Sequence, residues 1–301
     1  MAEPDALFES RRRPLRALAY RMLGSRSEAE DVVQDCWLRW QAARSQPGAE
    51  PIAEPAAWLS RVATNLCLDR LQSARARREH YVGVWLPEPL VDGAAAEVDP
   101  GPEARSEYAQ EVSVAFLLVL ERLTPLERAA FLLHDVFDLG FDEVATRLGR
   151  SAAACRQLAS RARTHVQAAQ ARVDVRDDEA QGLLAAFAGA LGSGDVGALA
   201  TLLAEDARML SDGGGQVAAV PRPVLGAARV AQVMAGFARL WDPATQPVAP
   251  ARINGLHGVV MRDLHGRALQ TMAFAFSRRS DGRACVAEVY VVRNPDKLAR
   301  V

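Results

Sequence analysis

Lysine is almost missing from this sequence of 301 residues: of its 36 basic residues, one, Lys297, is lysine and the other 35 are arginine. Aromatic residues are also few, at 6%, and the formal net charge is only −1. Because half of the residues are hydrophobic, the composition excludes global disorder and is typical of ordinary globular domains. The near-zero charge argues against nucleic-acid binding only if the charges are spread evenly along the chain.

Paired cysteines and long hydrophobic runs are missing as well. Four cysteines lie far apart and form no CxxC pair, which indicates a reducing compartment and no disulfide framework. The most apolar stretch, residues 112–120, is about half as long as the ~18 residues of a membrane span. Residues 1–5 are acidic with no apolar segment behind them, unlike a signal peptide. We therefore expect a cytoplasmic protein with no membrane partner.

The charges that are present are segregated. Residues 141–176 carry seven basic and three acidic groups, a balance of +4, whereas residues 83–140 carry three and eleven, a balance of −8. From Arg147 to Arg172 there are six arginines and no acid. A short basic segment beside a strongly acidic one indicates a nucleic-acid contact that the total charge conceals.

Composition and periodicity divide the chain into four parts. Residues 1–82 and 107–172 read as helical, and residues 83–106, with four prolines and three glycines, read as a linker. Residues 179–301 mix helices with alternating segments, which predicts an α+β domain with a curved antiparallel sheet. Its helices are expected within 181–204 and at 227–240, and its strands at 207–210, 216–220, 256–262, 267–277 and 283–292.

The first helical part has clear local signals. A capping box of Ser27 and Glu30 predicts a helix at about 28–43. Its apolar face is Val32, Val33, Cys36, Trp37 and Trp40, and a second face carries Asp31, Gln34, Asp35 and Leu38. The second face is either a solvated polar surface or a docking face for a partner helix. A further helix, at about 56–77, ends in arginines that either complement the helix dipole or hold phosphates.

The second helical part is more specific. Thr124 before Pro125 predicts a helix start, and that helix is expected to run to about Phe137. Helices at 141–148 and at about 152–166, separated by Gly149 and capped by Ser151, form the helix-turn-helix pattern. The buried stripe of the last helix is expected at Ala154, Cys155, Leu158, Ala162 and Val166. Its opposite face carries Arg156, Gln157, Ser160, Arg163 and Thr164, residue types that bind bases and phosphates in a major groove. The alternative is a generic amphipathic helix with a basic outer face.

These parts, in this order, resemble a bacterial extracytoplasmic-function (ECF) sigma factor of the sigma-70 family over residues 6–172. Residues 29–35 (AEDVVQD) resemble region 2.2, which docks on RNA polymerase, and residues 58–69 resemble regions 2.3 and 2.4, which melt and read the −10 element. Residues 123–163 resemble region 4, which reads the −35 element. The resemblance implies two all-α sigma domains, with RNA polymerase core and promoter DNA as partners.

The resemblance also assigns roles to single residues. It assigns polymerase docking to Asp31, Gln34, Asp35 and Leu38. It assigns −10 contacts to Arg61, Asn65, Asp69 and Arg75, with the loop at 45–55 completing the reading pocket. It assigns −35 contacts to Ser151, Arg156, Gln157, Ser160, Arg161 and Arg163.

The extension beyond residue 172 resembles the cone-shaped SnoaL-like, nuclear-transport-factor-2-like fold. The motifs WLPEP, DGGG and NPDKL are similar to those of sigma factors with a fused SnoaL-like regulatory domain, which packs against the sigma domains and the linker. The interdomain regulatory residues are then Trp85, Leu86, Pro87, Glu88, Pro89, Asp212, Gly213, Gly214, Gly215, Asn294, Pro295, Asp296, Lys297 and Leu298. Gln216 departs from the pattern, because a basic residue is expected there.

Two alternatives stay open for the extension. It is a small-molecule sensor if apolar residues of the cone (Met234, Phe237, Met272, Phe274 and Phe276) line a ligand site. It is a vestigial SnoaL-like enzyme if acid/base groups meet in the cone, as such chemistry requires. His257, His265 and Glu288 form no convincing dyad, so we expect no catalytic residue, metal or cofactor. A one-site transcription regulator is disfavoured by the region 2 pattern, and the free protein is expected to be a monomer.

Overall fold

A computed structural model of the chain describes residues 3–45, 52–79, 81–91, 113–169 and 175–301, with the side chains at 3–4, 74–79 and 167–169 left aside. The chain forms two compact units. The first takes in Met1–His80, Gly93–Val112 and Phe116–Gln170, and the second takes in Tyr81–Asp92, Ser113–Ala115 and Ala171–Val301. The beginning of the sequence-defined linker therefore belongs to the same unit as the C-terminal extension.

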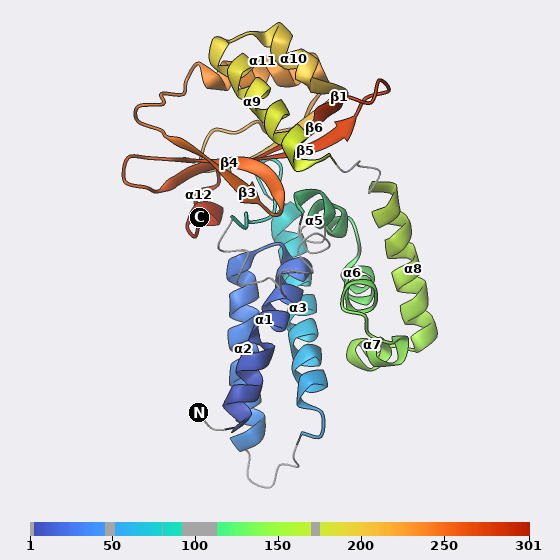
Figure 1. Cartoon of the computed structure of the whole chain (residues 1–301). Coiled ribbons are helices and arrows are strands. Elements are labelled where there is room, and N and C mark those ends of the chain that lie inside the picture. Colours follow the sequence, from blue (N-terminus) through green and yellow to red (C-terminus); the bar gives the residue numbers. More distant parts are fainter. Residues whose placement is uncertain (1–2, 46–51, 80, 92–112, 170–174) are drawn as a thin grey trace. The chain divides into compact units, whose positions relative to one another are not determined.

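The first unit opens with three helices, α1 (Glu3–Leu23), α2 (Arg26–Ser45) and α3 (Pro55–Glu79), seen in blue to cyan in Figure 1. Gly24 ends α1 in the left-handed conformation, at a φ of 67°, which costs glycine nothing. Ser25 then caps α2, because its Oγ accepts a hydrogen bond from the Glu28 amide at 3.2 Å. The capping box expected at Ser27 and Glu30 is wrong, and α2 begins at Arg26.

Burial along α2 follows the helical period. The buried residues are Ala29, Val32, Val33, Cys36 and Trp40. Trp37 is only half-buried, with its ring 4.8 Å from the Phe8 ring. Trp58 of α3 is half-buried too, and its ring lies 5.8 Å from that of Trp40. Buried and half-buried aromatic rings thus pack together within this three-helix bundle.

The first unit continues with α5 (Val114–Glu121), α6 (Pro125–Phe131), the π-helical turn η3 (Leu132–Val136), α7 (Phe141–Leu148) and α8 (Ala152–Ala169). Thr124 and Glu127 form a capping box at the start of α6, which confirms the predicted start at Pro125. The α-helix ends at Phe131 instead of about Phe137, because the Phe137 amide donates to the Leu132 carbonyl and widens the turn.

The helix-turn-helix pattern is present in the structure. Gly149 ends α7 in the left-handed conformation at a φ of 62°, and Ser151 Oγ accepts from the Ala154 amide at the start of α8. The buried side chains of α8 are Cys155, Ala159, Ala162 and Val166. Ala154 and Leu158, expected in this stripe, are only partly buried, because α8 packs against α6 as well as α7 and its buried face turns toward Ala159.

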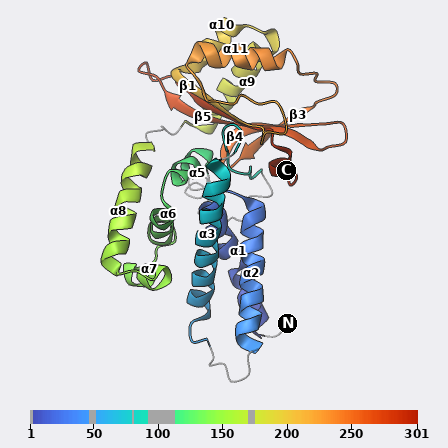
Figure 2. The ribbon, with the colours of Figure 1, turned by 180° about the vertical axis from the view of Figure 1, so that it is seen from behind.

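The second unit pairs helices with one sheet. Its helices are α9 (Asp177–Ser193), α10 (Val196–Leu202), α11 (Ala227–Ala238) and α12 (Pro295–Leu298). Its strands are β1 (Leu203–Asp212), β2 (Val224–Leu225), β3 (Val248–Ile253), β4 (Leu256–Arg262), β5 (Ala268–Arg278) and β6 (Ala284–Val292), in the order β2-β1-β6-β5-β4-β3. Within this unit α9, α10 and α11 lie over one face of the sheet in both views (Figure 1, Figure 2). The expected fold class, helical sigma domains followed by a sheet-containing domain, is confirmed.

Several details of the sheet differ from expectation, the unpredicted two-residue strand β2 among them. Residues 216–220 form no strand; the amides of Gln216 and Val217 donate to the Gly213 carbonyl and keep the chain in a turn. The strand β3 was not predicted, since Pro250 lies inside it, which an edge strand tolerates. The pairing of β1 with β6 is parallel, so the sheet is mixed and not purely antiparallel.

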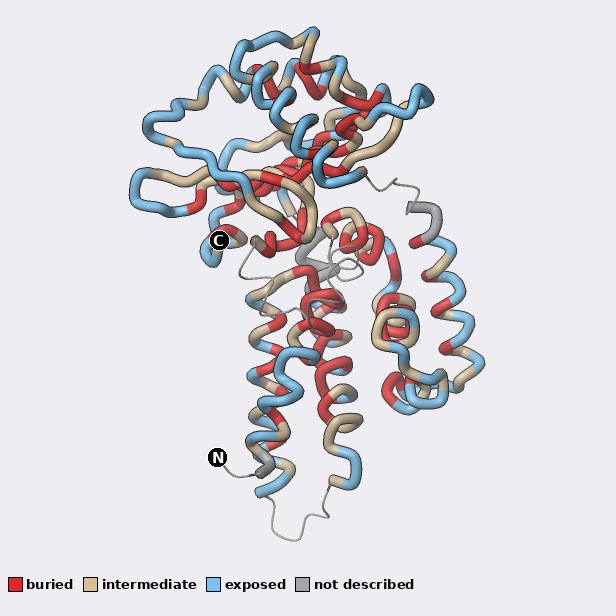
Figure 3. The backbone as a smooth tube through the Cα atoms, viewed as in Figure 1, coloured by how far each residue is buried: buried red, intermediate tan, exposed pale blue. Residues whose placement is uncertain are grey.

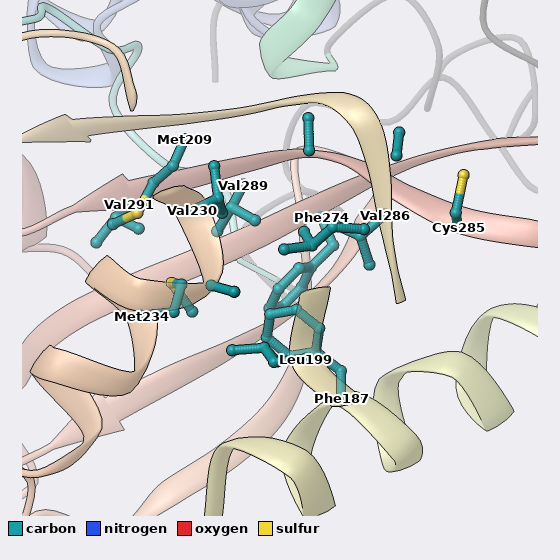
Figure 4. Packing of buried hydrophobic residues seen from close by; sticks show 14 residues of the cluster. Phe187, Leu199, Met209, Val230, Met234, Phe274, Cys285, Val286, Val289 and Val291 are labelled. Carbon is teal, nitrogen blue, oxygen red and sulfur yellow. The ribbon is translucent and has the colours of Figure 1, made fainter. Parts of the chain in front are cut away.

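The core of the second unit lies between the sheet and α9 to α11. Figure 3 shows buried residues along the central strands, and Figure 4 shows how apolar side chains of helices and strands interdigitate. Phe187 of α9 meets Phe274 of β5 edge to face, with ring centroids 5.4 Å apart. No helix in the described part of the chain combines the length and hydropathy of a membrane span.

Truncating Phe187 to alanine is expected to destabilise the second unit by about 3–5 kcal/mol, because it removes a buried ring and leaves a cavity. Hydrogen exchange measured by mass spectrometry should become faster in β5 and β6, while α1 to α3 keep their protection. Leu240→Ala is the control, since that side chain is 80% exposed. Unchanged exchange in Phe187→Ala would contradict the place of this ring in the core.

Candidate functional site

The outer face of α2 carries the residues that the resemblance assigns to polymerase docking. Asp31 and Gln34 are exposed, Leu38 is exposed by 55% despite being apolar, and Asp35 is partly exposed. We call these four residues the docking face. A single exposed leucine is common on protein surfaces, so the docking role rests on the resemblance.

Arg70 of α3 reaches this docking face and was not singled out in the sequence. Its Nη2 donates to Asp35 Oδ2 at 2.7 Å, and its Nη1 donates to the Glu28 carbonyl at 3.0 Å. The same Nη1 lies 3.6 Å from Asp31 Oδ2. Sequence spacing gave no signal for Arg70, because the contact joins two helices.

The residues assigned to the −10 element share one side of α3. Arg61, Asn65 and Asp69 are all exposed and follow one another at four-residue spacing, whereas Val62 and Leu66 are buried. The side chain of Arg75 lies outside the described residues, as do residues 46–51 of the loop expected to complete the reading pocket. The structure thus gathers three of the four assigned residues on a solvent-facing stripe.

The residues assigned to the −35 element lie on the exposed side of α8. Ser151, Arg156, Gln157, Ser160 and Arg161 are exposed. The Arg156 guanidinium lies 5.4 Å from the centroid of the Phe141 ring of α7, a cation–π contact. The outer surface of the helix-turn-helix therefore offers arginine and glutamine side chains, which read guanine and adenine.

Arg163 differs from these residues, because it already has a partner. Its Nε donates to Asp135 Oδ1 at 2.5 Å, and both side chains are partly exposed. Asp135 lies in the π-helical turn η3, which was not predicted, so this ion pair could not be found from the sequence. A partly exposed pair of this kind contributes little to stability.

A buried arginine of α6 binds the ends of α1 and α5 inside the first unit. Arg128 of α6 is 3% exposed and donates to the Met22 carbonyl at 2.5 Å and to Glu121 Oε1 at 2.8 Å. Burial lowers the pKa of its guanidinium. Since the helix α3 also contacts α6 and α7, the candidate −10 and −35 surfaces belong to one compact unit.

The three motifs of the predicted regulatory surface meet at Asp212, at the end of β1. Asp212 is completely buried, and its carboxylate accepts four hydrogen bonds. The Tyr81 hydroxyl and the Gly214 amide donate to Oδ1 at 2.5 and 3.0 Å. The Leu86 amide and Lys297 Nζ donate to Oδ2 at 2.8 and 2.7 Å. We call this arrangement the Asp212 cluster.

Lys297 binds more than the carboxylate of this cluster. Its Nζ donates to the Leu86 carbonyl at 2.5 Å and lies 4.3 Å from the centroid of the Trp85 ring. Tyr81 also faces it, at 5.2 Å from the ring centroid. Burial and the hydrogen bond to Asp212 raise the pKa of Tyr81, so its hydroxyl stays protonated and donates.

The glycines after Asp212 are required by close approach. A Cβ on Gly213 would lie 2.4 Å from the Val217 carbonyl oxygen, and one on Gly214 would lie 2.4 Å from Asn294 Nδ2. Gly215 has a φ of 72°, which disfavours other residues. A basic residue was expected at Gln216. Its Nε2 donates to Asp296 Oδ2 at 2.6 Å, so an uncharged donor makes the contact with the last motif.

The terminal motif and the linker segment are also held by main-chain bonds. The amides of Arg293 and Asn294 donate to the Asp212 carbonyl at 2.7 and 3.0 Å. Two hydrogen bonds join Leu90 to Asn254. The Leu90 amide donates to Asn254 Oδ1, and the Asn254 amide donates to the Leu90 carbonyl. Pro87, Glu88, Pro89 and Leu298 are buried, whereas Pro295 and Asp296 are exposed. Tyr81 and Asn254 were missed, because single polar residues in loops carry no periodic signal.

The titratable residues of the extension do not form a dyad. His257 pairs across the sheet with Phe274, whereas Glu288 pairs with Ala275, the next residue of β5, so the two lie on opposite faces. His257 Nε2 lies 3.1 Å from Asp177 Oδ1, and Glu288 is bound by Arg208. His265 is exposed in the turn between β4 and β5. Of the apolar cone residues, Met234 and Phe274 belong to the packed core, Met272 and Phe276 pack against it, and Phe237 is exposed.

Comparison with known proteins gives the relatives of the chain. Residues 7–77 match the family Sigma-70 region 2, and residues 113–166 match Sigma-70, region 4. The chain is 38% identical over 297 residues to the ECF RNA polymerase sigma factor SigJ of Mycobacterium tuberculosis, which covers 97% of this chain and 92% of that protein. It is 35% identical over 201 residues, 66% of each chain, to the probable ECF RNA polymerase sigma factor SigI of the same species. The crystal structure of SigJ covers 98% of both chains, with a TM-score of 0.72 and 34% identity.

Replacing Asp212 by asparagine is expected to release the segment 81–91 from the second unit. The change leaves the ammonium of Lys297, which is 13% exposed, without its counter-charge, at a cost of about 3–5 kcal/mol. Hydrogen exchange at the Leu86 amide and proteolysis within the segment should both become faster. Asp206→Asn, at an exposed position of the same strand, is the matched control; equal protection in the two variants would contradict the role of Asp212.

Replacing Asp135 by asparagine is expected to strengthen DNA binding, because it frees Arg163 and removes a negative charge beside the residues of α8 that the resemblance assigns to the −35 element. The slope of log K against log salt for a short duplex should steepen by about 0.9, the value for one additional phosphate contact. Fluorescence anisotropy between 50 and 200 mM salt measures this slope. Asp142→Asn removes one exposed acid from α7 as a control, and a slope equal to that control would rule out the competition.

Proposed function

The chain belongs to the ECF RNA polymerase sigma factors, which direct RNA polymerase to promoters, and we propose that its SnoaL-like C-terminal domain regulates promoter recognition within the same chain. The proposal assigns polymerase docking to α2, −10 reading to α3 and −35 reading to α8. It places the protein in the cytoplasm with RNA polymerase. The Asp212 cluster is the observation that carries the regulatory part.

The location of the segment 81–91, which the Asp212 cluster holds, supports this regulation. The segment 81–91 follows the −10 helix α3 in the sequence and leads toward the helices that carry the −35 residues. Its eleven residues correspond to at most about 36–40 Å of extended chain. While the Asp212 cluster holds them, that length is not available to separate the two DNA-reading parts.

The packing of the first unit supports regulation by inhibition. Arg128 joins α6 to the end of α1, and α3 packs on α6 and α7. A bipartite promoter presents its two elements at separate places on the duplex, so both are read at once only after these helices part. A fastened linker therefore favours the closed arrangement, and the C-terminal domain acts as an inhibitor.

The two alternatives for the C-terminal domain, a vestigial enzyme and a small-molecule sensor, have less support than intramolecular regulation. An acid/base site requires groups that meet, and His257 and Glu288 lie on opposite faces of the sheet. A ligand site requires apolar side chains around a cavity, and Met234 and Phe274 pack in the core instead.

Substituting Lys297 by methionine in the full chain is expected to raise transcription by core polymerase from a cognate promoter severalfold. The variant keeps the apolar stem and removes the charge that holds Leu86 and Asp212 together. Removal of residues 179–301 should change transcription in the same direction. A promoter near the gene of the protein serves as template.

Arg283→Met is the matched control, because it removes one positive charge from a side chain that is 83% exposed in the same unit. Transcription by Lys297→Met equal to that of this control, with core binding intact, would refute inhibition by the C-terminal domain. It would leave the assignment as a sigma factor untouched, since that rests on promoter-dependent initiation itself.

A further inference from the structure

We propose that Arg70 is a positioning residue for polymerase binding: it holds the carboxylates of the docking face in place and ties that face to the −10 helix. The inference rests on the proposed function of α2 as the polymerase-docking helix. Arg70 is not itself assigned a contact with polymerase or DNA. Its role is to act through Asp35 and Asp31.

The geometry is that of one guanidinium spanning two turns of a helix. Glu28, Asp31 and Asp35 follow at i, i+3 and i+7 and therefore share one face of α2. Arg70 donates to the Glu28 carbonyl at 3.0 Å and to Asp35 Oδ2 at 2.7 Å, with Asp31 Oδ2 at 3.6 Å. Two of these three groups are the acidic members of the docking face.

The planar fork of arginine suits this task better than a lysine would. Its nitrogens point in fixed directions, so a single side chain binds a carbonyl and a carboxylate at the same time. The Arg70 side chain is 25% exposed and that of Asp35 is 42% exposed. Such a partly solvated pair adds little to stability, so its effect is expected at the interface and not in the fold.

Preorganisation explains why the pair matters for binding. A carboxylate that is already held loses less side-chain freedom when a partner binds it. Exposed Asp31, by contrast, makes a longer contact to Arg70, at 3.6 Å. Since Arg70 immediately follows Asp69 on α3, the same side chain also fixes the docking face relative to the −10 stripe of Arg61, Asn65 and Asp69.

A double-mutant cycle on the full-length protein tests the inference. The measured quantity is the dissociation constant for purified core RNA polymerase, with the wild type, Arg70→Ala, Asp35→Asn and the double variant. We expect Arg70→Ala to weaken binding about tenfold, and to weaken it less than about twofold further when Asp35→Asn is already present. Arg70→Lys, which keeps the charge and loses the fork, should recover only part of the loss.

The controls separate positioning from charge and from folding. Arg12→Ala removes one positive charge from an exposed side chain of α1 and should bind core like the wild type. Thermal unfolding of Arg70→Ala should stay close to that of the wild type, and Arg70→Lys provides a second, milder variant. Losses that simply add in the double variant, or wild-type affinity in Arg70→Ala, would overturn the inference.

Leu38→Asp distinguishes this failure from that of the proposed function, because it changes the apolar member of the docking face and not a carboxylate that Arg70 binds. Weak core binding by Leu38→Asp together with normal binding by Arg70→Ala would reject the positioning role alone. Normal core binding by Leu38→Asp and Asp35→Asn would reject the docking face, and the positioning role with it.

Discussion

A carboxylate with no access to water is the constraint on which the second unit depends. Asp212 is completely buried, and an unpaired charge in that position would be prohibitive. Its two oxygens are satisfied by Lys297, the Tyr81 hydroxyl and two main-chain amides. The three segments that supply these donors are far apart in the sequence, so none can leave without exposing or orphaning the charge. Burial thus makes a linker segment part of the C-terminal domain.

The first unit uses charge in the opposite way. The pairs of Arg70 with Asp35 and of Arg163 with Asp135 are partly exposed, and water screens them. Each contains a residue of a surface expected to meet polymerase or DNA. A buried pair resists exchange and holds a structure together. Of the two exposed pairs, that of Arg163 with Asp135 is expected to give way to a phosphate, whereas that of Arg70 with Asp35 is expected to hold a carboxylate in place for a partner. The difference in burial separates the contacts that hold the fold from those that act on a partner.

Local signals carried most of the fold. The predicted strand at 256–262 is β4, and β5 and β6 were placed to within one residue at each end, because alternation and turn glycines mark them. The strand β3 was hidden by Pro250, and the parallel pairing of β1 with β6 depends on contacts that no local pattern reports. The π-helical turn was missed for a similar reason, since a widened turn has no sequence signature of its own.

In the candidate sites, too, local patterns were predicted and contacts between elements were missed. The exposed stripes of α3 and α8 follow from helical spacing and were predicted as faces, although their functional roles came from resemblance. Arg70, Asp135 and Tyr81 were missed, because each matters through a partner on another element. Sequence spacing places a residue on a face, and only the folded chain places it beside its partner.

The single lysine, Lys297, shows how the geometry of the partners selects the side chain. At Lys297 a compact ammonium donates to a carboxylate and to the Leu86 carbonyl, with the Trp85 ring 4.3 Å away. These partners surround one point, which suits a small charge with three donors, whereas a guanidinium spreads its donors across a plane. The chain uses arginine at its 35 other basic positions, and its one lysine stands where the partners surround a point instead of lying along the plane of a guanidinium. Lysine is therefore expected to be retained there by geometry, because both side chains carry the same charge.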